Sequence, residues 1–450
     1  MSRPALTLET LRRELARLTI DAHEARLQVA VSGGVDSTAL LHAMAAIARG
    51  GASRRPLRAL HVEHGLHPES AAWASHCRTT AARLDVPLQV LTIRVPVDAA
   101  AGVEAAARTA RYAALEAALG AGDILLTAHH RDDQAETLLL QLLRGAGPRG
   151  LSAMPAVRPF GRGRLARPLL AFGRAALVRY ARRHGLAWLE DPANADLRFA
   201  RSFLRVEVMP KLRARWPAAA ANLARAARHQ AEICELADTA AAQAIAPLLE
   251  GDCLRVAGLR RLDRTLGRLV LRHWIHCRGF PTPSARKLDT ALGQALHAAP
   301  DALPCVRWCG AEMRRYRDRL YLLEPLAEHC ARPLPWRMES PLELPAGLGR
   351  LHALPTVGHG LRKSLGEGAL EIGFRQGGEC LRPTGSPYRR PLKKLFQERG
   401  VVPWMRDRLP LIRARSQLVA VADLWTAHES TAGPGQDGWR IEWRDHPPLY

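Results

Sequence analysis

The chain has 450 residues, of which 47% are hydrophobic and 24% are charged, a balance typical of globular proteins with room for two or three domains. It has no apolar run of about 18 residues, the length that a membrane span needs, and its N-terminus is patterned like an amphipathic helix and not like a signal peptide, so we expect a cytoplasmic protein that makes no membrane contact. The net charge of +22 predicts a polyanionic partner.

The first strong signal lies where an apolar strand-like segment, residues 27–31, turns into a helical segment, residues 38–44. The hexapeptide Ser32-Gly33-Gly34-Val35-Asp36-Ser37 joins them. Two glycines let successive backbone N–H groups point into one concavity at the helix N-terminus, which suits a phosphate or pyrophosphate. Asp36 would repel that anion unless a metal ion or a cationic substrate lies between them. An ordinary tight turn is the alternative interpretation, and the acid and the second serine make it less favoured.

Strand-like and helical segments then alternate along the chain as far as residue 143. The expected strands are 57–62, 88–95 and 123–128, and the expected helices are 70–84, 103–119 and 132–143. This alternation predicts a doubly wound α/β fold with a mostly parallel sheet. Ligands bind outside the carboxyl ends of such strands, so the glycine loop, His64-Gly65 and His129-His130 should share one edge.

A second polar cluster, His129-His130-Arg131-Asp132-Asp133-Gln134-Ala135-Glu136-Thr137, follows the strand at 123–128. Capping of the helix N-terminus accounts for one aspartate, but it does not require two adjacent acids. If the helix begins near Asp132, then Asp133 and Gln134 should point into the crevice near Asp36. Carboxylates of Asp36 and Asp133 could hold Mg²⁺ on a nucleotide or orient an ammonium group. A metal pair of His129 and Asp133 is an alternative for which the sequence offers no third ligand.

The rest of the chain predicts two further domains. Pro210 and Pro217 close the first domain at residues 1–217. A mainly helical middle domain, 218–331, follows, with helices over 218–249, 259–278 and 284–297 and strand-like segments at 306–308 and 319–322. Prolines between residues 332 and 355 mark the second boundary, after which 332–450 is expected to form an α+β domain with one helical segment near 393–399.

Both polar clusters resemble a known family. The hexapeptide is the signature of the PP-loop ATP pyrophosphatases, and a longer set of segments resembles tRNA(Ile)-lysidine synthetase. The first and last parts of the chain carry this likeness, and the middle part adds no recognised motif. The segments are 61–66, 104–108 with 111–112, 128–137, 144–147 with 150–151, 167–170, 188–194, 381–383, 391–398 and 402–408. The chain departs from the family pattern at His67, where arginine is frequent, and at Ser202, where asparagine is frequent.

The resemblance implies a reaction and its partners. ATP would adenylate the oxygen on carbon 2 of the wobble cytidine of tRNA(Ile) with a CAU anticodon and release pyrophosphate. Free L-lysine would then attack that carbon and expel AMP. ATP is thus expected as cosubstrate, Mg²⁺ as cofactor, tRNA and lysine as partners, and a homodimer as a further expectation.

The resemblance also assigns roles to residues. ATP is expected at Ser32, Gly33, Gly34, Val35, Asp36 and Ser37, with Asp36 and Asp133 as catalytic residues and as ligands of Mg²⁺. Contacts to lysine or nucleotide are expected from Arg108, Arg111, His129 and Asp132. Contacts to tRNA are expected from Arg201, Arg205, Arg382, Lys393, Lys394 and Arg406.

Two alternatives from other classes remain open in the sequence. A tRNA-thiolating relative would use the same ATP chemistry but needs a reactive cysteine or a metal-bound cluster. The eight cysteines form no CxxC pair, and Cys77 alone precedes residue 230, so reduced structural cysteines are the favoured interpretation. A nucleotide-binding or RNA-binding protein without catalysis would explain the charge, but it would not need Asp36 and Asp133 together.

Overall fold

A computed structural model describes residues 5–18, 26–50, 56–65, 68–95, 103–190, 196–299, 302–328, 332–368 and 370–450. The chain divides into two compact units, residues 1–237 and 238–450, and each is described by itself. No helix within the described ranges combines the length and apolarity needed to cross a membrane. The domain boundaries expected at 217/218 and 331/332 stay a prediction. Residues 66 and 191–194 of the family-like segments, the departure at His67, and Cys330 lie outside the described residues.

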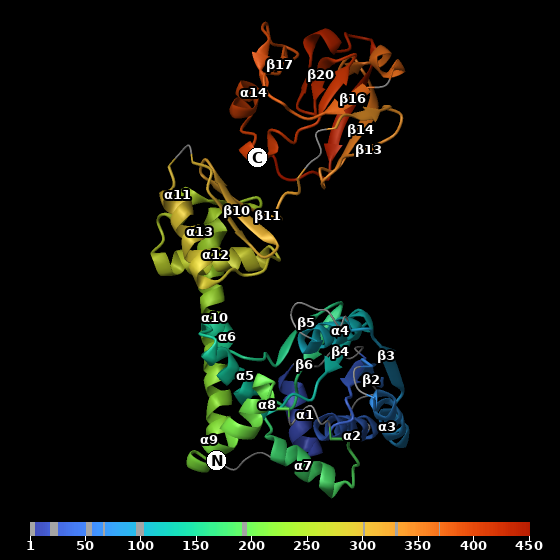
Figure 1. The fold of residues 1–450 in the computed structure, drawn as a ribbon, viewed down its shortest axis with the longest axis vertical. Coiled ribbons are helices and arrows are strands. Elements are labelled where there is room, and N and C mark those ends of the chain that lie inside the picture. The colour runs from blue at the N-terminus through green and yellow to red at the C-terminus, as the bar shows by residue number, and fades with distance from the viewer. Residues whose placement is uncertain are drawn as a thin grey trace. The chain divides into compact units, whose positions relative to one another are not determined.

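The first unit is built on a six-stranded sheet of order β3-β2-β1-β4-β6-β5 (Figure 1). The strands are β1 (Leu27–Ala30), β2 (Leu57–Glu63), β3 (Leu88–Thr92), β4 (Ile124–Leu126), β5 (Val157–Phe160) and β6 (Gly163–Ala166). All neighbours pair in parallel except β5, which joins β6 as an antiparallel hairpin. The central strand β4 is wholly apolar, as expected for a strand that helices cover on both faces of the sheet.

The first unit also contains helices, the last of which continues into the second unit. They are α1 (Leu8–Arg17), α2 (Val35–Arg49), α3 (Ser70–Arg83), α4 (Val103–Ala117), α5 (Arg131–Leu143), α6 (Pro148–Leu151), α7 (Arg174–Arg183), α8 (Ala200–Phe203), a π-helical turn (Leu204–Val208), α9 (Met209–Arg215) and α10 (Ala219–Ile245). One core cluster joins Val29 and Ile124 to Leu40 of α2, and another joins Leu125 and Leu165 to Leu115 of α4. The doubly wound, mostly parallel fold is therefore confirmed.

The second unit begins with helices packed against an antiparallel sheet of order β7-β8-β11-β10-β9. These elements are β7 (Leu249–Glu250), β8 (Cys253–Arg255), α11 (Val256–Leu259), α12 (Arg264–Cys277), α13 (Ala285–His297), β9 (Cys305–Trp308), β10 (Ala311–Tyr316) and β11 (Arg319–Leu323). The helix expected from residue 259 starts later because the Asp263 side chain accepts hydrogen bonds from the N–H groups of Thr265 and Leu266 and caps α12 there.

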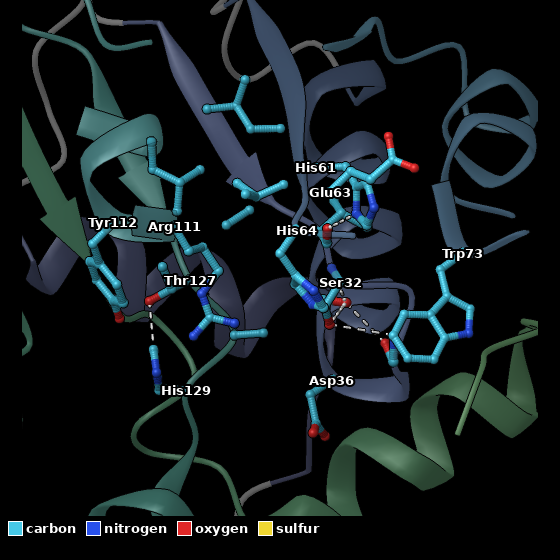
Figure 2. A pocket seen from close by; sticks show the side chains of 18 of the residues that line it. Ser32, Asp36, His61, Glu63, His64, Trp73, Arg111, Tyr112, Thr127 and His129 are labelled. Atoms are coloured by element: carbon cyan, nitrogen blue, oxygen red, sulfur yellow. Dashed lines mark hydrogen bonds between the residues drawn. The ribbon is translucent and has the colours of Figure 1, made fainter. Parts of the chain in front are cut away.

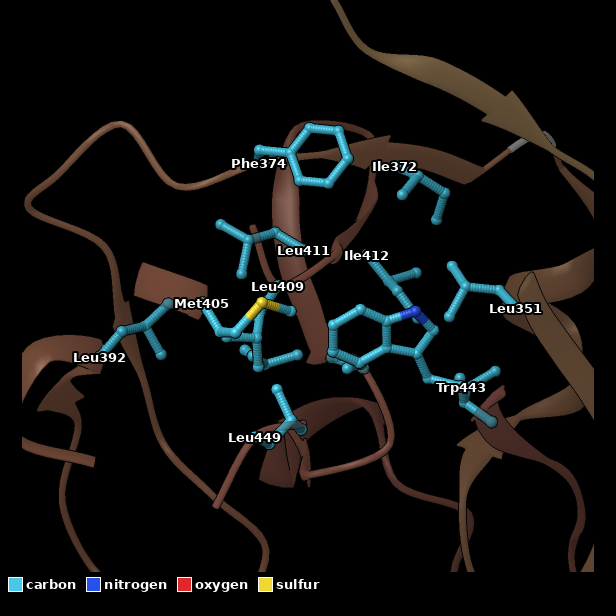
Figure 3. Packing of buried hydrophobic residues seen from close by; sticks show 14 of the residues in the cluster. Leu351, Ile372, Phe374, Leu392, Met405, Leu409, Leu411, Ile412, Trp443 and Leu449 are labelled. Atoms are coloured by element: carbon cyan, nitrogen blue, oxygen red, sulfur yellow. The ribbon is translucent and has the colours of Figure 1, made fainter. Parts of the chain in front are cut away.

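The C-terminal part of this unit is rich in antiparallel strands. Its sheets have the orders β12-β16-β19-β20-β21, β13-β14-β22-β15 and β17-β18. The elements are β12 (Leu334–Trp336), β13 (Leu342–Glu343), β14 (Arg350–Val357), β15 (Leu361–Arg362), β16 (Leu370–Gly373), β17 (Cys380–Leu381), β18 (Arg390–Pro391), α14 (Leu392–Arg399), β19 (Leu411–Ala414), β20 (Gln417–Val421), β21 (Trp425–Thr426) and β22 (Asp437–Arg444). Figure 3 shows Leu351, Ile372, Leu411 and Trp443 meeting in its core. The expected C-terminal α+β architecture is confirmed, and α14 forms at the helical segment expected near 393–399.

Candidate functional site

The glycine loop forms an N–H-rich turn between β1 and α2. Gly33 has a φ of 84°, a left-handed conformation that glycine adopts without strain. Gly34 is the N-cap of α2, and no side chain caps this helix end. The Ser37 hydroxyl donates to the Gly34 carbonyl at 3.0 Å and lies 3.2 Å from the Ser32 hydroxyl. The N-terminal amides of α2 are thus available to an anion.

A cavity of about 370 Å³ opens at the carboxyl edge of the sheet, beside this loop. Figure 2 shows Ser32 and Asp36 on one side of it and Arg111, Tyr112, Thr127 and His129 on the other. The cavity brings together most of the expected ATP and catalytic residues. Its lining from these sets comprises Ser32, Gly34, Asp36, Ser37, Arg111, His129 and Asp133.

Asp36 carries a carboxylate oxygen without a protein partner. Its Oδ1 is buried and makes no hydrogen bond to any described residue. Its Oδ2 lies 3.5 Å from His130 Nε2 and 3.9 Å from Arg174 Nε. A buried carboxylate oxygen with no donor is the kind of ligand that Mg²⁺ or an ammonium group would satisfy. Asp36 therefore fits a cation held between the loop and a bound phosphate.

His130 joins Asp36 to Asp133 at the start of α5. The backbone N–H of His130 donates to Asp133 Oδ2 at 2.9 Å, and the Asp133 N–H donates to His130 Nδ1 at 3.3 Å. His130 is 2% exposed. Burial disfavours its charged form, but the hydrogen bond to Asp36 and the charges of Asp36 and Asp133 outweigh this and raise the pKa of His130. The imidazole thus fixes the two acids relative to each other.

Asp133 is also bound by arginines from a later segment. Its Oδ1 lies 3.4 Å from Arg201 and 3.1 Å from Arg205, and both arginines also clamp the buried Glu136 at 2.9 to 3.0 Å. Burial opposes ionisation of Asp133, yet His130 and Arg201 lower its pKa overall. Because its oxygens already have donors, Asp133 is less suited than Asp36 to hold Mg²⁺. Arg201 and Arg205, expected to contact tRNA, are turned toward these acids.

Glu136 was missed by sequence reasoning, although a signal for it existed. It lies three residues after Asp133 on α5, so helix geometry puts both acids on one face. The expectation that Gln134 points into the crevice was wrong. Its amide instead bonds both the N–H and the carbonyl of Met154 at 3.0 and 2.9 Å, because one residue further along α5 turns the side chain well away from Asp133.

The remaining candidates of the first unit occupy different places. His129 Nδ1 lies 2.9 Å from the Thr127 hydroxyl. Burial, opposed by Asp133 and aided by nearby guanidinium groups, lowers the pKa of His129 to about 3, so its ring is neutral. Arg108 lies 5.0 Å from the centre of the Tyr112 ring. Asp132 accepts a hydrogen bond from the N–H of Arg174 at 2.8 Å and pairs with Arg213, which ties α7 and α9 to the start of α5.

Cys77 lies behind the glycine loop. Its side chain is fully buried, and its sulfur is 3.5 Å from His61 Nδ1. A Cβ placed on Gly33 would come within 3.4 Å of that sulfur, so the loop packs closely on the thiol. Burial raises the pKa of Cys77 to about 11, which makes it a poor nucleophile.

The tRNA-contact candidates of the second unit lie in its C-terminal part. Lys393 and Lys394 are exposed on α14, on the face opposite the buried Leu395 and Phe396. Arg382 donates to the Ser386 carbonyl at 3.0 Å. Arg406 donates to the Val401 carbonyl at 3.0 Å and to the Tyr316 hydroxyl at 2.8 Å.

Comparisons with known proteins cover nearly the whole chain. Family models match as a PP-loop domain over residues 7–212, a TilS substrate binding domain over 254–321 and a TilS substrate C-terminal domain over 370–443. The tRNA(Ile)-lysidine synthase of Alkalilimnicola ehrlichii is 45% identical over 449 residues, covering 99% of this chain and 98% of the relative. That of Methylococcus capsulatus is 44% identical, covering 95% of this chain and 99% of the relative. That of Coxiella burnetii is 42% identical, covering 92% of each chain.

Proposed function

Because the chain belongs to the tRNA(Ile)-lysidine synthase family, we propose that it joins free lysine to carbon 2 of the wobble cytidine of tRNA(Ile) with a CAU anticodon. The chain is a ligase with a PP-loop ATP-binding domain. One observation supports the detailed reaction best. The glycine loop, which leads into the uncapped N-terminus of α2, and Asp36, which has a carboxylate oxygen without a hydrogen-bond donor, line the same cavity.

In the first step the cytidine oxygen attacks the α-phosphorus of ATP. The bond between the α- and β-phosphates breaks, and pyrophosphate leaves with the bonding electrons. Backbone amides of Gly33, Gly34 and Val35, together with the hydroxyls of Ser32 and Ser37, would hold that pyrophosphate and stabilise its growing charge. The loop is preorganised for this because Ser37 is already fixed by the Gly34 carbonyl.

In the second step the lysine ε-amine attacks carbon 2. The carbon–oxygen bond breaks, AMP leaves with the original oxygen, and the nitrogen gives up a proton. The ionised Asp133 and the unpaired oxygen of Asp36 are the carboxylates that could attract the ammonium form and take that proton. The contact of His130 with Asp36 at 3.5 Å and its backbone hydrogen bond to Asp133 hold these acids in place.

Mg²⁺ fits this cavity on the Asp36 side. Its chemistry, when bound, is to neutralise phosphate charge. The Oδ1 of Asp36 offers one ligand, and such ions commonly take few protein ligands and complete their shell with phosphates and water. Among the described residues no cluster of at least three His, Cys, Asp or Glu side chains is arranged as a metal site.

The body of the tRNA is expected to bind outside the cavity. Lys393 and Lys394 present an exposed pair on α14, and Arg382 lies in the same C-terminal part. Phosphate contacts of this kind position an RNA without reading its sequence. A cytoplasmic location and a homodimer remain part of the proposal.

Omission of single substrates tests the reaction. With ATP and tRNA(Ile) alone we expect pyrophosphate release and an adenylated RNA, and with added lysine we expect AMP and a lysidine-containing tRNA. Ornithine and glutamine, which differ from lysine in length or charge, are the control amines, and sulfide tests the thiolation alternative. Equal use of sulfide, ornithine or glutamine would show that the assigned substrate is wrong.

A further inference from the structure

The first turn of α7 lies beside the first turn of α2. The two helices pack against each other, and Leu177 and Tyr180 of α7 belong to the same buried cluster as the core residues of α2. The Tyr180 hydroxyl also lies 2.9 Å from Nδ1 of His42 on α2. This packing brings Arg174, the first residue of α7, next to Asp36 of the phosphate-binding turn.

The backbone of Arg174 is fixed to the start of α5. Its N–H donates to Oδ2 of Asp132 at 2.8 Å. Two residues earlier, the Phe172 carbonyl accepts from the N–H of Arg131 at 2.9 Å. Gly173 leaves room for this approach, because a Cβ there would lie 2.6 Å from the guanidinium of Arg131 and 3.4 Å from the Asp132 carboxylate. The position of Arg174 along the chain is therefore held firmly from both sides.

The guanidinium head of Arg174 is held far more loosely than its backbone. The side chain is 52% exposed, and its Nε lies 3.9 Å from Oδ2 of Asp36, too far for a hydrogen bond. This contact is the one ion pair that Arg174 makes within the described ranges of the chain. A half-exposed pair at such a distance contributes little stability, so another anion can replace the carboxylate. A guanidinium offers five N–H donors in a planar fork that matches phosphate oxygens.

This head stands next to the place proposed for the pyrophosphate. Asp36 lies in the first turn of α2, whose N-terminal amides are uncapped by side chains. The amides carry only partial charges and Asp36 repels an anion, so a full positive charge here would stabilise pyrophosphate. Arg174 approaches Oδ2 of Asp36, which leaves Oδ1 to Mg²⁺. Nε2 of His130 also lies 3.5 Å from Oδ2, so that oxygen keeps a neighbour when Arg174 moves away.

We propose that Arg174 is a catalytic residue that leaves Asp36 when ATP binds and donates its N–H groups to the pyrophosphate portion of ATP. When the bond between the α-phosphorus and the bridging oxygen breaks, the electron pair stays on the departing pyrophosphate. The guanidinium remains protonated throughout and stabilises that growing charge. The inference rests on the proposed function and adds to it a residue that lies outside both polar clusters of the sequence.

Arg174→Ala tests this role in the first step, with ATP and tRNA(Ile) present and lysine absent. Pyrophosphate release should fall by about 10²-fold or more, as for loss of a preorganised donor to a departing anion. The inhibition constant for added pyrophosphate should rise about ten-fold or more. Arg174→Lys should fall between the parent and the alanine variant, because it keeps the charge without the fork. Free guanidinium ion should partly restore release by Arg174→Ala, and sodium chloride at equal concentration should not.

The matched control is Arg179→Ala. Arg179 is an exposed arginine of the same helix, and five residues of helix turn its side chain about 140° away from that of Arg174. This variant should release pyrophosphate like the parent. Equal behaviour of the two alanine variants would overturn the proposal. A rise in the KM for tRNA with unchanged inhibition by pyrophosphate would also overturn it, since Arg174 would then contact a phosphate of the RNA.

Calorimetric titration of the free protein with pyrophosphate and Mg²⁺ tests the contact without tRNA or lysine. Arg174→Ala should bind pyrophosphate about ten-fold or more weakly than the parent and Arg179→Ala, and equal affinities would contradict the contact. Failure of the proposed function is seen separately, as AMP release by the parent that needs no lysine. The titration still tests Arg174 in that case.

Discussion

Asp36 is the residue whose surroundings say most about chemistry. One carboxylate oxygen faces a buried histidine, and the other is buried with no donor from the described part of the chain. A carboxylate whose role was to stabilise the fold would be paired at both oxygens, because an unsatisfied buried acceptor lowers stability. Its position in the first turn of α2 contributes a favourable interaction with the helix dipole, but that alone would not require burial.

We therefore predict that Asp36→Ala folds normally but does not adenylate tRNA. Thermal unfolding should match the parent, because the substitution loses one contact with His130 at 3.5 Å and relieves one unsatisfied oxygen. Pyrophosphate release from ATP and tRNA should fall by about 10²-fold or more, the range seen when a preorganised electrostatic group is removed. An unfolding curve like that of the parent together with undiminished release would contradict this role.

At the scale of elements, α5 is locked to the segment that follows α7 by ion pairs across the chain. Glu136 of α5 is 2% exposed and receives Arg201 from α8 and Arg205 from the π-helical turn. Both arginines remain partly exposed at 29 to 30% of their side chains, so the network is buried on its acidic side only. Removal of the acid would leave Asp133 as the carboxylate that both cations share.

Glu136→Ala should destabilise the first unit strongly. Loss of one partner from a buried pair costs about 3–5 kcal/mol, and the partial exposure of the arginines places the expected value near the lower limit. Chemical denaturation monitored by circular dichroism measures the shift of the first transition. Glu232→Ala, which breaks an exposed pair with Arg228 on α10, is the control and should change stability by less than about 1 kcal/mol. Equal effects of the two substitutions would show that the network is not structural.

Local patterns explain why most elements of the first unit could be predicted and some partners could not. Strands β1, β2 and β4 and helices α2, α3 and α5 lie within a few residues of their expected ranges, because apolar periodicity is a local property. The β5–β6 hairpin was not predicted, since its strands are short and partly polar. Pairing of Glu136 with Arg201 and of Asp36 with His130 depends on how distant segments pack, which one sequence does not reveal.

In the candidate site, too, features set by local sequence could be predicted, and features set by the packing of distant segments could not. The glycine loop and Asp133 were predicted because their residue types and their places after strands carry the signal. The orientation of Gln134 was wrong, since a small shift in helix register turns a side chain away from its expected face. Arg167 was quoted only as part of a motif, and its place beside Thr127 became visible when β6 was found beside β4.

At the scale of the whole molecule, the net charge is +22, and the basic residues differ in whether they are paired with acidic side chains. Many arginines are paired, as those around Asp133 and Glu136 show. Lys393 and Lys394 differ, because both are exposed on α14 and neither joins an ion pair among the described residues. Unpaired surface cations of this kind are suited to a polyanionic substrate.

The double variant Lys393→Ala, Lys394→Ala should weaken tRNA binding and flatten its salt dependence. Each lost phosphate contact lowers the slope of log K against log salt by roughly 0.7 to 0.9. Adenylation should fall mainly at limiting tRNA, with the KM for ATP unchanged. Binding is measured by filter retention over a range of salt concentrations. Lys363→Ala is the control, since Lys363 is paired with Asp437 at 2.9 Å, and an unaltered slope in the double variant would assign both lysines to the solvated surface.

The Cys77 thiol behind the glycine loop can report on the motion of that loop. Cys77 is fully buried, and with a pKa of about 11 it is almost entirely protonated at neutral pH. An alkylating reagent can reach its sulfur only when the surrounding packing, which includes Gly33, opens, so the speed of modification reports how often that opening occurs. A ligand that binds the closed loop lowers the population of the open form and slows modification in proportion. The rate at which Cys77 is modified, with and without a ligand, therefore measures how often the phosphate-binding loop opens.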